Sequence, residues 1–196
     1  IYKKASVDLA ATETLVSFGP WGLRLVARDD GVAYRFETSF PGRITVDAET
    51  AGISLPPTTE TYVNYCWGDW RGDPLQNSWE SVTGKMKASE IATPTNVIAY
   101  LPFAFRGADG TAVCVTEADL VDYPGWNLRV APSSPDVLLR GEFARYPKKT
   151  AYHETGEMSE TKRLRAQRVL SREDYLVRTD GTRTFPWRCF MIARNF

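Results

Sequence analysis

The segment WGLRLVARDDGVAYRFE, residues 21–37, decides the fold class. In an extended chain, its first half places Leu23 and Leu25 on one face. After the turn at 29–31, apolar residues again recur at every second position over 32–36. Two runs of period two around a tight turn predict an antiparallel β-hairpin.

Two further Asp-Gly pairs extend this pattern along the chain. The pair at 109–110 lies between the apolar runs 98–103 and 111–115, which predicts a second hairpin. The pair at 180–181 is predicted to be a third turn, with strands on both sides of it. Repeated short strands with tight turns predict an all-β, antiparallel β-sandwich, with residues 1–196 as a single domain.

Two stretches fit this pattern less well. Residues 62–80 contain Trp67, Trp70 and Trp79 among glycine, aspartate and proline, which predicts a long ordered loop. Residues 158–170 are rich in helix formers, but their apolar positions form a poor stripe for packing on a core. We expect an exposed arm or a long hairpin there.

The overall composition excludes several classes of function. Lys plus Arg and Asp plus Glu both number 24, so no net charge attracts nucleic acid or an anionic membrane. No apolar run approaches the ~18 residues that a membrane-spanning helix needs. The last residues, 190–196, continue an apolar strand without a polar tail, so we expect the parent polypeptide to continue beyond them.

Common catalytic motifs are missing from the sequence. His153 is the only histidine and lies in a polar stretch without a nucleophile motif, so no catalytic triad is predicted. Cys66, Cys114 and Cys189 are odd in number and far apart, which favours buried thiols in strands over a disulfide framework or a metal site. No phosphate-binding glycine motif occurs. We therefore predict no catalytic residue in this chain.

Carboxylates at the end of one strand are the remaining candidates. Val113 and Val115 alternate onto one face, and the same period places Glu117 and Asp119 on that face. A buried acid needs a partner, because an unpaired buried charge costs several kcal/mol. Even a neutral polar group that is buried without a hydrogen bond costs about 2–7 kcal/mol. That partner can be an arginine, a set of backbone amides or a hard cation such as calcium. The sequence favours an ion pair, and it predicts that Asp122 caps a type II turn over 123–126.

Three stretches together resemble one family. Residues 116–125 (TEADLVDYPG), 31–36 (GVAYRF) and 181–188 (GTRTFPWR) are similar to the N-terminal domain of glycoside hydrolase family 97. Their order and separation fit from about residue 19 to residue 193. The resemblance implies a galactose-mutarotase-like super-sandwich, here truncated at its N-terminal end, which would leave sheet edges exposed and prone to aggregation or dimerisation.

The same resemblance implies a function for the parent protein. The family's sandwich precedes a (β/α)-barrel with the catalytic carboxylates, in α-glucosidases or α-galactosidases that act on α-linked oligosaccharides with calcium. The matching position for the glutamate that the sandwich supplies to the interdomain calcium site is Glu117. The resemblance also implies a bacterial periplasmic or secreted location, and it predicts that this chain alone is inactive.

Two alternatives remain open. A free-standing carbohydrate-binding module fits the sandwich pattern and the tryptophan-rich loop, although Trp67 and Trp70 match the family poorly and receive no sugar-binding role from it. The other alternative is a purely structural domain, in which Glu117 makes only an ion pair. Calcium-independent sugar binding would distinguish the first alternative, and unchanged calcium dependence of the intact enzyme after Glu117→Gln would distinguish the second.

Overall fold

The computed structural model describes residues 10–67, 73–76, 81–91, 97–131, 134–152 and 167–194. Strands dominate these residues, and two short 3-10 helices are the helical elements among them. Neither helix is long or apolar enough to cross a membrane. The strands are β1 (Thr12–Ser17), β2 (Trp21–Arg28), β3 (Gly31–Val46), β4 (Gly52–Leu55), β5 (Glu60–Trp67), β6 (Gly84–Lys87), β7 (Val97–Arg106), β8 (Ala112–Ala118), β9 (Trp126–Ala131), β10 (Val137–Phe143), β11 (Pro147–Tyr152), β12 (Gln167–Arg172), β13 (Val177–Thr184) and β14 (Trp187–Ala193); the 3-10 helices are η1 (Pro74–Gln76) and η2 (Ala88–Glu90).

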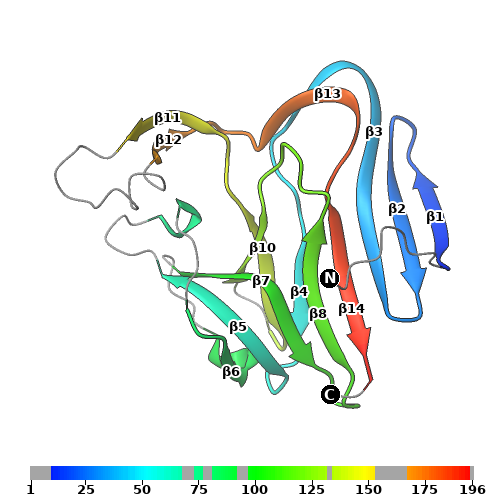
Figure 1. Ribbon diagram of the computed structural model, residues 1–196, viewed down its shortest axis with the longest axis vertical. Helices are drawn as coiled ribbons and strands as arrows, with labels where there is room; N and C mark the ends of the chain where they lie inside the picture. Colours follow the sequence, from blue (N-terminus) through cyan, green and yellow to red (C-terminus); the bar gives the residue numbers. More distant parts are fainter. Residues whose placement is uncertain are drawn as a thin grey trace, which may run out of the picture.

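Twelve of the described strands pair antiparallel in one large sheet that folds into a sandwich. Its order is β1-β2-β3-β14-β8-β7-β9-β10-β4, with β13 paired to β3 and the β5–β6 pair joined to β7. Figure 1 shows β1, β2, β3, β14 and β8 side by side, while β11 and β12 form a separate two-stranded ribbon. The predicted all-β, antiparallel sandwich is confirmed.

Strand β7 connects the two layers of the sandwich. In the sheet order, β1, β2, β3, β14 and β8 lie on one side of β7, and β9, β10 and β4 lie on the other. The second half of β7, from Phe103 to Arg106, pairs with β8, whereas Ala99 and Tyr100 in its first half pair with β9. The two layers enclose the core between them, and its most buried side chains come from both: Phe103, Val115, Leu128 and Leu139 are all 0% exposed. Cross-strand apolar pairs of this kind are the main stabilising units of a sheet.

The first two predicted hairpins are confirmed. Strands β2 and β3 pair from Arg28↔Gly31 outward around the turn at 29–30. Strands β7 and β8 flank the Asp109-Gly110 pair, where Gly110 has a φ of 84° that few other residues adopt without strain.

The third predicted turn, at Asp180-Gly181, is wrong. Strand β13 runs through this pair without a break and pairs with β3 on both sides of it, with a register shift between Asp180 and Thr182. A Cβ on Gly181 would lie 2.8 Å from the Gly42 carbonyl oxygen and closer still to that of Phe40. Between the pairs on either side of Gly181, β3 has three residues, 40–42, opposite this single glycine, so the bulge lies on β3. The glycine permits the close approach of that bulge and does not mark a chain reversal.

The predicted loop over 62–80 is also corrected in part. Strand β5 extends to Trp67, because residues 60–67 pair with β7 over most of their length. Trp70, Trp79 and His153 lie outside the described residues. Most of the predicted arm at 158–170 does so too, but its described end, from Gln167, pairs with β11 as a strand of a hairpin.

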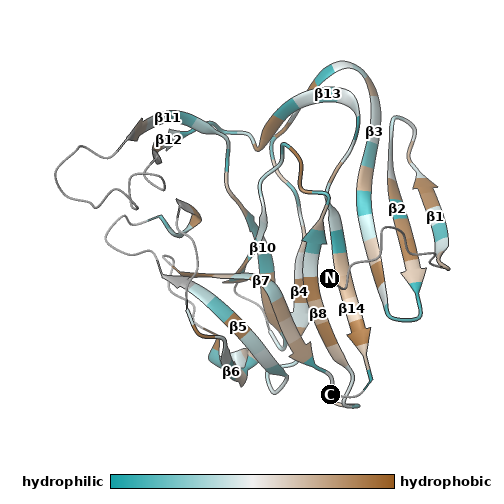
Figure 2. Ribbon diagram, in the orientation of Figure 1, coloured by the Kyte–Doolittle hydropathy of each residue, from teal (hydrophilic) through white to brown (hydrophobic). Residues whose placement is uncertain are grey.

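One face of the sheet continues past the region that the second layer covers. Val32 pairs with Phe190, which pairs with the fully buried Val115, so all three side chains share a face. On that face Val16 is 38% exposed, Leu25 39% and Val32 45%. Figure 2 shows hydrophobic residues on β2, β8 and β14. Part of this apolar face is therefore exposed at the N-terminal strands.

Candidate functional site

Glu117 occupies the inner face of β8 near the end of the strand. The alternation from Val113 and Val115 carries it there, as the sequence predicts, and its side chain is 16% exposed. Its Oε2 atom accepts two hydrogen bonds, from Arg188 Nη1 at 2.7 Å and from the Trp126 backbone N–H at 3.0 Å. Two of the partners that the sequence left open, an arginine and a backbone amide, are therefore both present.

Arg188 lies at the start of β14, directly opposite Glu117 in the β8–β14 ladder. Its side chain is 1% exposed. The guanidinium forks onto Glu49, with Nε donating to Oε1 at 2.8 Å and Nη2 to Oε2 at 2.7 Å. The rings of Trp126 and Phe143 lie 5.4 and 5.1 Å from its central carbon. Bidentate pairing of this kind fixes the plane of the guanidinium as well as its position.

Glu49 belongs to the connection between β3 and β4, and its side chain is 5% exposed. Within the described part of the chain, the ion pairs of Glu49 and Glu117 are both made with the single guanidinium of Arg188. We call these three side chains the Glu49–Arg188–Glu117 cluster. With all three ionised, the cluster carries one excess negative charge in a largely buried location.

The surroundings of the cluster disfavour that excess charge. Burial raises the pKa of Glu117, and the Trp126 amide and Arg188 oppose this rise only in part. Burial, followed by the charge of Glu49, also raises the pKa of Tyr123, which keeps its phenol neutral. Either a proton on Glu117 or a cation beside it would balance the cluster.

A pocket of about 300 Å³ lies beside Glu117. Its Oε1 atom, for which the described residues supply no hydrogen-bond donor, would lie 3.2 Å from a Cβ added to Gly125. Glycine at this position therefore leaves room at the free oxygen. The pocket is lined by Leu75, Tyr100, Leu101, Glu117, Gly125, Trp126, Asn127 and Ala144.

The donor atoms at this pocket fit part of a calcium site. A carboxylate oxygen is a ligand that calcium favours, but the ion takes ~6–8 oxygen ligands. No group of three or more His, Cys, Asp or Glu side chains that could hold a metal ion occurs among the described residues. Glu117 is the one carboxylate among the described residues that line the pocket, so most of the charged ligands would have to come from elsewhere.

Two other predicted acids do not join Glu117. Asp119 was expected on the same face, but it follows the end of β8 with a φ of 57°, which ends the alternation. Its side chain is 51% exposed and lies 3.6 Å from Arg35. The type II turn expected over 123–126 is also wrong, because it requires a positive φ at Gly125; the positive φ, 46°, is found at Asp122 instead.

Sequence reasoning missed Arg188 and Glu49. Arg188 carried a usable signal, since alternation in β14 places it on the same face as the apolar Phe190, just as it places Glu117 beside Val115. Glu49 carried none, because it lies in a connection and is 139 residues from its partner.

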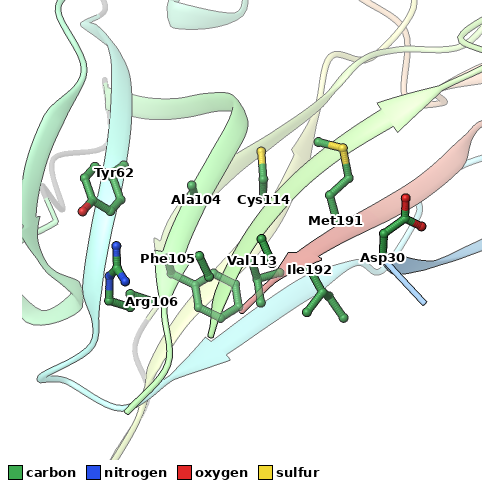
Figure 3. Close-up of a pocket in the computed structure, with 11 residues that line it drawn as sticks. Asp30, Tyr62, Ala104, Phe105, Arg106, Val113, Cys114, Met191 and Ile192 are labelled. Carbon is green, nitrogen blue, oxygen red and sulfur yellow. The ribbon is translucent and has the colours of Figure 1, made fainter. Parts of the chain in front are cut away.

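A second pocket, of about 590 Å³, lies at the other end of β8 and β14. Figure 3 shows Ala104, Cys114 and Met191 along it, with Tyr62 and Arg106 at one side. Its lining is mainly apolar, and among the described lining residues the one carboxylate belongs to Asp30. The cysteines along these strands, Cys114 and Cys189, are free, as the sequence favoured, but they are half-buried and not fully buried as expected.

The described residues therefore form an antiparallel sandwich with a partial carboxylate site. A family model described as Glycosyl-hydrolase 97 N-terminal matches residues 1–196, and the chain belongs to this family. The resemblance seen in the sequence is confirmed.

Individual relatives are longer than this chain. It is 30% identical over 176 residues to a retaining alpha-galactosidase of Bacteroides thetaiotaomicron, a match that covers 88% of the chain and 25% of that protein. The chain thus spans about a quarter of the length of this curated relative.

Solved structures share the fold. A glycoside hydrolase family 97 enzyme in complex with acarbose, from Pseudoalteromonas sp. strain K8, superposes with a TM-score of 0.59 at 18% identity, over 97% of this chain and 28% of that one. A crystal structure of a beta-arabinopyranosidase gives 0.56 at 15% identity, over 96% and 31%.

Proposed function

We propose that this chain is the non-catalytic N-terminal sandwich of an α-glycosidase, packed on a (β/α)-barrel catalytic domain, and that Glu117 supplies one ligand to a calcium ion shared between the two. The family membership and the short span relative to the alpha-galactosidase support the first part. The free Oε1 of Glu117 beside a pocket supports the second.

The observation that carries the calcium proposal is the charge of the cluster. Two largely buried glutamates share one arginine, so a cation that contacts Glu117 relieves an excess of negative charge and fills the gap beside its free oxygen. When bound, calcium polarises a substrate oxygen and orients groups around it. The role of this chain is to present the Glu117 carboxylate in a fixed direction.

The enzymatic part of the proposal is tested by separating the domains. Residues 1–196 alone should not hydrolyse aryl α-galactosides or α-glucosides, whereas the intact enzyme should hydrolyse one of them. Hydrolysis by residues 1–196 at an enzyme-like rate would refute the assignment of catalysis to another domain. Cell fractionation tests the accompanying expectation that the enzyme is exported to the periplasm or secreted.

The calcium part is tested by Glu117→Gln in the intact enzyme. This substitution should weaken calcium binding and lower turnover, because an amide oxygen is a poorer and uncharged ligand. Glu37→Gln is the matched control, since Glu37 is a carboxylate of similar exposure, 19%, paired with Arg24 and Arg35. Unchanged calcium affinity in Glu117→Gln would remove Glu117 from the site.

A free-standing carbohydrate-binding module remains the second candidate function. It predicts that residues 1–196 bind malto-oligosaccharides or galactosides without calcium, measured by titration calorimetry. A flat titration at millimolar sugar would eliminate it.

A further inference from the structure

We infer that Arg188 and Glu49 are positioning residues for Glu117: the pair holds the Glu117 carboxylate with Oε1 directed at the pocket and screens the arginine charge from a cation bound there. This inference rests on the proposed role of Glu117 in calcium binding.

The first step of the argument is geometric. Arg188 donates hydrogen bonds from Nε and Nη2 to the two carboxylate oxygens of Glu49, which fixes the guanidinium in one plane. Nη1 then points at Glu117 Oε2, at 2.7 Å, and the Trp126 amide binds the same oxygen. Two donors on one oxygen leave the other oxygen, Oε1, as the available ligand atom.

The second step concerns rigidity. Arg188 and Glu117 face each other across paired strands, so the backbone ladder sets their separation. The rings of Trp126 and Phe143 pack around the guanidinium and restrict its movement. A carboxylate supported in this way keeps one orientation, which lowers the entropic cost of binding an ion.

The third step concerns charge. An arginine next to a divalent cation repels it, and this repulsion is strong where water is largely excluded. Glu49, with both oxygens on Arg188 and 5% exposure, offsets the arginine charge at the closest distance available. Arg188 can therefore orient Glu117 without opposing the cation. A purely structural ion pair would need only one of the two glutamates.

The inference predicts that residues which do not contact the ion change its affinity. Groups that orient metal ligands typically change metal affinity by ~10–100-fold when substituted. In the intact enzyme we expect Glu49→Gln and Arg188→Lys each to weaken calcium binding by about tenfold or more. Glu49→Gln exposes the cation to an unbalanced arginine, and Arg188→Lys retains the charge but loses the fork.

The measurement is direct calcium titration of the intact enzyme, by calorimetry and by competition with luminescent terbium, on variants with a cooperative melt and an unchanged near-UV spectrum. Glu37→Gln is the control and should bind calcium like the parent. If Glu49→Gln does not fold, Glu49→Asp replaces it, since it retains the charge and shifts the carboxylate; its affinity should also fall.

The outcomes separate the two hypotheses. Weaker binding in folded Glu49 and Arg188 variants, with Glu37→Gln unchanged, supports the inference. Affinity within twofold of the parent in these variants, together with weak binding in Glu117→Gln, overturns the inference and leaves the proposed function intact. Unchanged affinity in Glu117→Gln itself refutes the proposed function.

Discussion

Arg188 on β14 and Glu117 on β8 are direct cross-strand partners, and their side chains are joined by a hydrogen bond of 2.7 Å. The same guanidinium holds Glu49 from the connection between β3 and β4. The Arg188 side chain therefore links β14, β8 and the connection between β3 and β4.

Removing that side chain should be costly. Arg188→Met should lower the free energy of unfolding by about 3–5 kcal/mol, because it leaves two largely buried glutamates without their counterion. Urea titration followed by fluorescence measures the change. The double variant Arg188→Met/Glu49→Gln should recover part of the loss; a double variant that is less stable than Arg188→Met would contradict the charge argument.

The bulge in β3 opposite Gly181 gives a second prediction. Gly181→Ala should destabilise the protein by more than Gly42→Ala, because its new Cβ would press on the backbone carbonyl oxygens of Phe40 and Gly42. At Gly42 the space around the Cβ is open, so only the positive φ of 69° is penalised, at about 1–2 kcal/mol. Thermal melts of both variants compare the two costs, and equal melting temperatures would count against the close contact.

The pH dependence of stability should reflect Glu37. Hydrogen bonds from Arg24 hold the pKa of this carboxyl below its usual range, with Arg35 contributing. The unfolded chain therefore binds the proton more tightly than the folded protein does. As a result, the contribution of Glu37 to the free energy of unfolding is complete above the unfolded pKa. It is lost as the pH falls through the lower folded pKa. Glu37→Gln should therefore flatten the loss of stability below about pH 4.5. Urea midpoints between pH 3 and 7 test this, and parallel curves for both proteins would contradict it.

The thiols should react slowly in the folded protein. Burial raises the pKa of both Cys114 and Cys189, so little thiolate is present at pH 7–8. In a Cys66→Ser background, labelling by Ellman's reagent should be slow without urea and fast in urea. Immediate labelling of both thiols in the folded state would contradict the described burial.

The open apolar face should cause self-association of residues 1–196. Val32→Lys or Leu25→Lys should shift sedimentation towards the monomer, because each places a charge on the face that the second layer leaves uncovered. Val82→Lys is the control, as the Val82 side chain is 93% exposed. If the unsubstituted chain of residues 1–196 stayed monomeric at high concentration, this prediction would be contradicted.

Local patterns predicted much of this molecule, and contacts between distant segments account for what they missed. Alternation placed Leu25 and Glu117 on the correct faces, because period two follows from the strand backbone itself. The Asp180-Gly181 prediction was wrong, since a glycine suits both a turn and a strand position opposite a bulge, and only the bulged course of β3 distinguishes the two. Glu49 could not be predicted from the sequence for a similar reason, because its role depends on folding that brings the distant Arg188 beside it.

The division of β7 between the layers also affects how the protein opens. Phe103 is hydrogen-bonded into one layer and Ala99 into the other. Neither layer can peel away without breaking bonds on this shared strand, so the sandwich should lose its structure in one step. Amide protons of β8 and β9 should then exchange with solvent at a common slow rate, as members of one cooperative unit.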